Sequence, residues 1–197
     1  MKIRNGFVSN SSSSSFIVGF TSIPETKGQL LDIMFPKDME YLDGETSVSS
    51  VVSRVWQDLE GAKPMTKEEI IEELQCGTYE DGIYSNWQYE ALRKKETEVM
   101  NKIDKKFCEK YKCTTEKCYD YKDWNKELNT ARDKFWEDQR KLSLKLAKEF
   151  MKDNFTTKEW INKIPIKFEY EDHGAFGCVM EHGDIFRNLP HIRISKH

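Results

Sequence analysis

The sequence predicts an α+β protein with a small sheet from N- and C-terminal strands, short helices, and a long central antiparallel helical hairpin. Three observations predict this fold class. Short β-rich stretches lie near both ends. Capped amphipathic stretches follow the first of them, and residues 86–153 repeat apolar side chains at helical spacing among many charged ones. We expect residues 1–197 to fold as a single α+β domain, with residues 86–153 as a helical hairpin insertion.

The N-terminal part of the predicted sheet consists of two short strands around a run of serines. Residues 3–8 and 16–20 are rich in β-branched and aromatic side chains, whereas residues 9–15 contain nothing apolar to bury. We therefore expect the serine run to form an exposed loop. The candidate functional residues of this loop are Asn10, Ser11, Ser12, Ser13, Ser14 and Ser15.

Three interpretations of the serine loop stay open. Serine-rich segments are flexible linkers, although only one short strand precedes this one. Successive backbone N–H groups and hydroxyls between two strands can also hold a phosphate or another anion. The run can instead be a recognition or modification tag that another protein reads.

Short helices are expected in the next part of the chain. Residues 30–34 form the apolar part of the first one. Ser47 is a good N-cap for a second helix, in which the apolar residues of 48–59 make one stripe. Thr66 and Glu69 have the spacing of a capping box, which predicts the start of a third.

Two long helices are expected in the middle of the chain, because apolar residues recur there at nearly heptad spacing while lysine and glutamate fill the outer faces. The apolar positions are Leu92, Val99, Ile103, Phe107 and Tyr111 in the first helix and Trp124, Leu128, Ala131, Phe135, Leu142, Leu146 and Phe150 in the second. The helices are joined near Thr114 and Thr115. The resulting hairpin either packs on the rest of the chain or projects to meet a partner.

The C-terminal part of the chain is predicted to return to β structure. A second capping box, Thr156 with Glu159, predicts one more short helix. Residues 166–170 and 191–195 alternate apolar and polar side chains, and residues 176–180 are apolar throughout. We expect these three strands to join the N-terminal strands in one sheet, which would bring the serine loop near the histidine-bearing turns.

All four histidines lie in the last 25 residues. Imidazole and carboxylate groups are ligands of zinc, iron and manganese, and they are also the groups of acid–base catalysis. The candidate metal ligands are His173, His182, Asp184 and His191, and the candidate catalytic residues are His173, His182 and His191. Zinc or another divalent metal is the cofactor that such a site implies. Because no compact ligand spacing is present, ordinary roles in turns and at the surface stay open.

Five cysteines and no export signal indicate reduced thiols in a cytosol. Cys108, Cys113 and Cys118 are spaced C-x4-C-x4-C across the expected hairpin tip. They would hold zinc only with a fourth ligand from elsewhere, and otherwise they are small, partly buried residues between helices.

The charge balance gives no support to nucleic-acid binding, because the formal net charge is −3. Lysine and arginine number 7 against 14 acidic residues over residues 1–85, and 18 against 14 over residues 86–153. Residues 1–85 are therefore acidic, and residues 86–153 are mildly basic. No apolar run approaches the roughly 18 to 20 residues that span a bilayer, so we expect no membrane partner.

Two stretches resemble proteins of one origin. The N-terminal RNGFVSNSSSSSF, residues 4–16, resembles the start of many uncharacterised proteins encoded by large tailed bacteriophages. The C-terminal EHGDIFRNLPHIRIS, residues 181–195, is similar to stretches of such proteins as well. The resemblance implies a viral accessory protein working in the host cytoplasm, and it assigns no catalytic residues.

We expect this chain to act by binding a host or viral macromolecule, as an inhibitor or modulator of host machinery would. Such a binder predicts that Trp87, Trp124 and Trp136 on the hairpin are not all buried. The alternative is a metal-dependent hydrolase or phosphoesterase that uses the C-terminal histidines and acids, with the serine loop as a phosphate cradle. A virion or assembly component is a third option.

Overall fold

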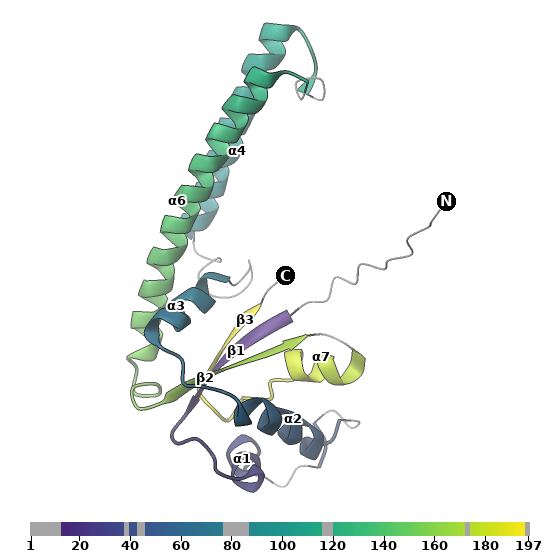
Figure 1. The fold of residues 1–197 in the computed structure, drawn as a ribbon, viewed down its shortest axis with the longest axis vertical. Coiled ribbons are helices and arrows are strands. Elements are labelled where there is room, and N and C mark those ends of the chain that lie inside the picture. The colour runs from purple at the N-terminus through teal and green to yellow at the C-terminus, as the bar shows by residue number, and fades with distance from the viewer. Residues whose placement is uncertain are drawn as a thin grey trace, which may run out of the picture.

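A three-stranded antiparallel sheet forms the centre of the molecule, and two long helices extend away from it as an arm (Figure 1). The computed structural model describes residues 13–37, 40–42, 46–76, 87–115, 120–171 and 174–195. The α+β fold class predicted from the sequence is confirmed. Among the described residues, no helix is both long and apolar enough to cross a membrane.

Strand β1 (Ser13–Phe20) is the central strand, with β2 (Ile164–Glu171) on one side and β3 (His191–Ser195) on the other. Both neighbours run antiparallel to β1, and Phe16 lies opposite Phe168 of β2. Every residue of β1 after Ser13 is buried, as expected for a strand that is covered on both faces. Strands from the two ends of the chain therefore share one sheet, as predicted.

One face of the sheet, called here the α2 face, is covered by α1 (Lys27–Met34), α2 (Val48–Glu60) and α7 (Gly174–His182). Its core includes Phe16, Val18, Phe20, Val51, Val55, Ile166, Phe168, Met180, Ile185 and Phe186. The predicted cap of α2 is confirmed, because the Ser47 side chain accepts a hydrogen bond from the Ser50 amide.

The opposite face, called here the α6 face, is covered by α3 (Lys67–Cys76) and by the last part of α6 (Lys122–Phe155). Its core includes Ile17, Ile70, Leu74, Leu146, Ala147, Trp160 and Ile194. The predicted capping box at the start of α3 is confirmed. The Thr66 amide donates to Glu69 Oε2 at 2.7 Å, and the Glu69 amide donates to Thr66 Oγ1 at 3.2 Å.

The arm consists of α4 (Trp87–Tyr111) and the first part of α6, packed antiparallel. This confirms the predicted helical hairpin. At 34 residues, α6 is about 50 Å long, so it reaches from the sheet to the far end of the arm (Figure 1). A separate small core of Ile103, Phe107, Trp124 and Leu128 closes that far end.

The strand predicted over residues 176–180 is wrong, because this segment lies within helix α7. A short apolar run fits a buried strand and a buried helix equally well by periodicity alone. Here β2 and β3 already flank β1, and Met180 of the helix packs on the α2 face instead. Helix α7 begins at Gly174, whose backbone φ angle is 72°.

The short helix predicted from Thr156 and Glu159 does not form either. Helix α6 continues to Phe155, and the Thr156 hydroxyl donates to the Lys152 carbonyl in its last turn at 2.6 Å. Thr156 therefore ends a helix and does not start one. Turns follow up to Trp160, which is buried on the α6 face. The strand predicted over residues 3–8 lies outside the described residues.

Candidate functional site

The described part of the serine run belongs to β1, so the prediction of an exposed loop is wrong for Ser14 and Ser15. Both residues are 0% exposed. They are the second and third residues of a strand whose successive side chains point to opposite covered faces. Asn10, Ser11 and Ser12 lie outside the described residues. The buried serines cannot form an open anion cradle.

Ser14 takes part in a buried polar cluster that joins three elements. Its hydroxyl donates to Glu181 Oε1 of α7 at 2.9 Å, and Arg193 Nε of β3 donates to the same hydroxyl at 3.2 Å. Glu181 is 1% exposed, and Arg193 Nη2 lies 3.8 Å from its Oε1. A buried carboxylate needs such donors and a nearby cation, because the interior solvates charge poorly.

His182 lies at the edge of this cluster and is half-exposed. Arg193 Nη2 lies 2.9 Å from His182 Nδ1. Because an arginine side chain has only donors, Nδ1 must accept, which leaves a neutral ring with its proton on Nε2. That Nε2 lies 3.5 Å from Glu181 Oε2. His182 is therefore held by a cation and an anion, which is a geometry for positioning and not for metal binding.

His191 has a different acidic neighbour. Its Nδ1 donates to the Leu189 carbonyl at 3.0 Å, and its Nε2 lies 3.5 Å from Asp184 Oδ1. His173 lies outside the described residues. Within the part of the chain that the structure describes, no three His, Cys, Asp or Glu side chains gather where they could hold a metal ion. The described geometry thus gives no support to the predicted metal site.

The polar cluster of Ser14, Glu181, His182 and Arg193 acts as a clamp between the central strand, α7 and the edge strand β3. Ser14 and Glu181 are inaccessible to a substrate, so the cluster offers no reactive group to solvent. Sequence reasoning missed this role of Glu181 and Arg193. The available signal was a single acid within an apolar helical segment, which is rare without a buried partner.

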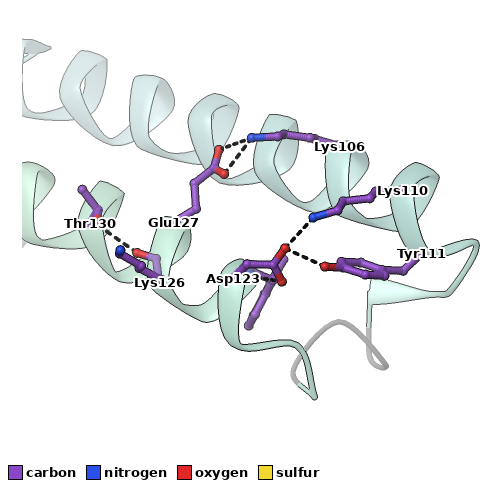
Figure 2. Close-up of polar contacts among 8 residues, drawn as sticks. Lys106, Lys110, Tyr111, Asp123, Lys126, Glu127 and Thr130 are labelled. Carbon is purple, nitrogen blue, oxygen red and sulfur yellow. Dashed lines mark hydrogen bonds and ion pairs between the residues drawn. The ribbon is translucent and has the colours of Figure 1, made fainter.

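A second candidate site is the tip of the arm, defined here as residues 102–115 and 120–127. Figure 2 shows ion pairs that join its two helices. Lys106 Nζ contacts Glu127 Oε2 at 2.7 Å, and Lys110 Nζ contacts Asp123 Oδ2 at 2.5 Å. The Tyr111 hydroxyl also donates to Asp123 Oδ2, at 2.6 Å. These contacts fix α4 against the start of α6.

Aromatic side chains support the same tip. Trp124 is 2% exposed, and its indole Nε1 donates to Asp104 Oδ1 at 3.0 Å. The rings of Tyr111 and Tyr121 stack with centroids 3.8 Å apart. Trp136, further along α6 towards the sheet, is 60% exposed. Of the two hairpin tryptophans whose side chains the structure describes, Trp124 is therefore buried and Trp136 is exposed, whereas the side chain of Trp87 is outside the described part.

The exposed charge of the tip is mostly positive. Three of its acidic residues, Asp104, Asp123 and Glu127, have partners within the tip. Two lysines are used in these pairs, while five further lysines are exposed. They are Lys102, Lys105, Lys112, Lys122 and Lys126. An ordered surface that carries several exposed cations can bind an acidic surface on another molecule.

Acidification is expected to loosen the tip. The hydrogen bond from Lys110 and that from Tyr111 lower the pKa of Asp123 to about 2, from 3.8 in an unfolded chain. A carboxylate with a lowered pKa stabilises the fold fully above its unfolded pKa, and this stabilisation is lost as pH falls through the folded pKa. The NMR signal of the Trp124 indole N–H should therefore be constant above about pH 4 and change towards pH 2.

The matched control for this titration is Asp123→Asn. In that variant, the change in the Trp124 signal towards pH 2 should disappear, because residue 123 no longer carries a carboxylate that pairs with Lys110. The packing of the two tip helices should already be weaker at neutral pH. A wild-type signal that stays constant down to pH 2 would contradict the assigned role of this carboxylate.

The cysteines of the tip do not provide a described metal site. Cys108 and Cys113 are half-buried and reduced, and Cys108 Sγ lies 3.7 Å from Thr115 Oγ1. Cys118 lies outside the described residues. The alternative interpretation, in which the three thiols hold zinc with a fourth ligand, therefore finds no support in the described part of the tip.

Comparisons with protein-family models, with curated proteins and with solved structures find no match to this chain. The two sites described above differ in their access to solvent. Of these, the polar cluster is buried, and the tip of the arm is accessible.

Proposed function

We propose that this chain is a binding protein that uses the tip of its arm to contact an acidic surface on another protein, host or viral. The observation that supports this proposal is the charge of the tip. Three of its acids are engaged in contacts between the two helices, and five exposed lysines outnumber the other two described acids, Glu109 and Asp120, which are exposed as well. Exposed cations of this kind steer association with an acidic partner.

The arm is suited to such contact by its length and its firmness. The first 21 residues of α6, from Lys122 to Leu142, extend over about 30 Å. A small apolar core and the ion pairs hold the tip helices together, so the lysines are presented on an ordered surface. An ordered surface loses less conformational entropy on binding than a flexible one.

The proposed setting is viral. The N-terminal stretch of residues 4–16 resembles proteins of large tailed bacteriophages, which supports an accessory role in the cytoplasm of an infected bacterium. Binding through the tip would then inhibit or redirect a host protein, or would join a viral assembly. The metal-dependent hydrolase has no specific observation in its favour, because the described histidines have other partners.

Charge reversal at the tip tests this function. The double variant Lys105→Glu/Lys122→Glu should lose its partner, since both lysines are exposed and their replacement places acids against an acidic surface. The matched control is Lys158→Glu, an exposed lysine outside the arm. The measurement is chemical cross-linking in infected bacteria followed by mass spectrometry, with the yield of each cross-linked partner compared among the three proteins.

We expect the wild type and the control to capture the same protein, and the tip variant to capture at least about tenfold less of it. The captured complex should also weaken with added salt. Equal capture by the tip variant would overturn the proposal. Loss of the complex after nuclease treatment would overturn it too, because the partner would then be a nucleic acid.

A further inference from the structure

We infer that the middle of the arm is a self-association surface, through which two copies of this chain pair into a four-helix bundle. The midsection is defined here as residues 88–100 of α4 and 129–142 of α6. This inference goes beyond the proposed function, since it concerns a different surface and a different partner. The tip lies beyond the midsection and stays available for another protein.

The midsection is poorly closed by its own two helices. No residue with a described side chain is buried in either of its segments, which together form several helical turns. The arm is closed at the tip by Ile103 and Phe107 and at the sheet by Leu146 and Ala147. Between these two cores, the seam of the hairpin is only partly covered, with Met100 and Ala131 half-buried against the tip core and Val99 exposed.

Apolar side chains line this seam. A groove of about 170 Å³ runs between the helices. Its apolar lining consists of Leu92, Val99, Met100, Ala131 and Phe135. Val99 is 39% exposed. Two antiparallel helices leave half of their apolar seam uncovered, and a second pair of helices is the common way to bury it.

The charges beside the groove favour a second copy over other occupants. Each helix contributes one cation and one anion, which are Lys95 and Glu96 of α4 and Lys134 and Asp138 of α6. Such a pattern is self-complementary under a two-fold axis, because every charge can face its opposite. A strongly acidic or strongly basic helix would leave two of these four groups facing like charge.

The register of the arm predicts which charges meet. The contacts of Lys145 with Gln88 and of Lys106 with Glu127 place Lys95 level with Asp138 across the seam. When two arms face each other about an axis along their length, α4 of one copy lies on α6 of the other. Lys95 of one copy then faces Asp138 of the other, and both tips point in the same direction.

Trp136 provides a built-in control, because it does not line the groove. It follows Phe135 directly, so it projects from α6 about 100° away from the groove-facing side chain. The exposed fraction of Trp136 is 60%, compared with 39% for Val99 in the groove. Replacing it removes an exposed aromatic side chain that lies outside the groove, and the only groove residue whose ring it is shown to meet, among the described residues, is Phe135, at a centroid distance of 6.0 Å.

The test is the oligomeric state of the full-length chain, measured by sedimentation equilibrium over a range of protein concentrations. One chain has a mass of 23.3 kDa, and the wild type should approach twice that mass. Val99→Lys and Lys95→Glu should each weaken dimerisation by at least about tenfold, since they place a charge in the groove or like charges across it. Trp136→Ala should dimerise as the wild type does.

The charge-swapped variant Lys95→Glu/Asp138→Lys should recover the dimer, because opposite charges then face each other again across the two-fold axis. Circular dichroism confirms that each variant keeps its helices. A monomeric wild type at all concentrations would overturn the inference, as would a dimer lost in Trp136→Ala but kept in Val99→Lys. The tip variant Lys105→Glu/Lys122→Glu should remain dimeric, so failure of the dimer and failure of partner binding are distinguishable.

Discussion

Replacing Arg193 by methionine is expected to lower the free energy of unfolding by about 3–5 kcal/mol. The reason is the burial of Glu181, whose carboxylate receives its hydrogen bond from Ser14 and has the Arg193 guanidinium as its nearby cation. Removing the guanidinium leaves a charge in the interior that is only partly compensated. Urea denaturation followed by circular dichroism provides the measurement.

A double-mutant cycle makes this prediction specific. When the buried acid and its cation are both replaced by apolar residues, as in Arg193→Met/Glu181→Leu, most of the lost stability should return. If the free energies of unfolding of Arg193→Met and Glu181→Leu both remain within about 0.5 kcal/mol of the wild-type value, the cluster does not hold the three elements together as we describe.

Phe186→Ala is expected to lower the free energy of unfolding by about 3–5 kcal/mol. Phe186 is 0% exposed, and its ring centroid lies 5.4 Å from that of Phe16 and 5.1 Å from that of Phe168. It thus connects the loop after α7 to the two strands that form most of the α2 face. The alanine variant leaves a cavity among rigid aromatic rings, which cannot collapse to fill it.

Two control variants accompany this measurement. Phe186→Leu keeps most of the side-chain volume and should cost less than about 1.5 kcal/mol. Phe176→Ala removes the same ring from an exposed site on α7, 39% exposed, and should change stability much less. Equal losses for Phe186→Ala and Phe176→Ala would show that the α2 face is not packed as described.

Local signals made the helices predictable. The apolar spacing of residues 86–153 indicates two long helices, and the structure has them as α4 and α6. Ser47 and the pair Thr66–Glu69 mark helix starts because their side chains satisfy the first amide groups, a purely local interaction. At Thr156 the same kind of local signal gave a wrong prediction. Helix α6 continues to Phe155, so Thr156 is the C-cap of that helix and not the start of a new one.

The candidate sites were less predictable, because they depend on contacts between distant residues. Ser14 and Arg193 are 179 positions apart in the sequence, and the serine run gives no sign that one of its hydroxyls meets a buried acid. The apolar spacing alone separates Trp124 from Trp136, and only Trp124 is buried. The hydrogen bond from its indole to Asp104 of α4 left no such signal, because it joins residues 20 positions apart.

By itself, the sequence determined the α+β class, the helical hairpin, the caps of α2 and α3, and the two C-terminal strands that flank β1. Each follows from spacing or from an interaction within a few residues. Only the tertiary structure decided that residues 176–180 are helical, that Ser14 and Ser15 are buried, and that Asp104, Asp123 and Glu127 at the tip are engaged in contacts between the two helices. These outcomes depend on which surfaces the packed elements cover, and burial is a property of the whole fold.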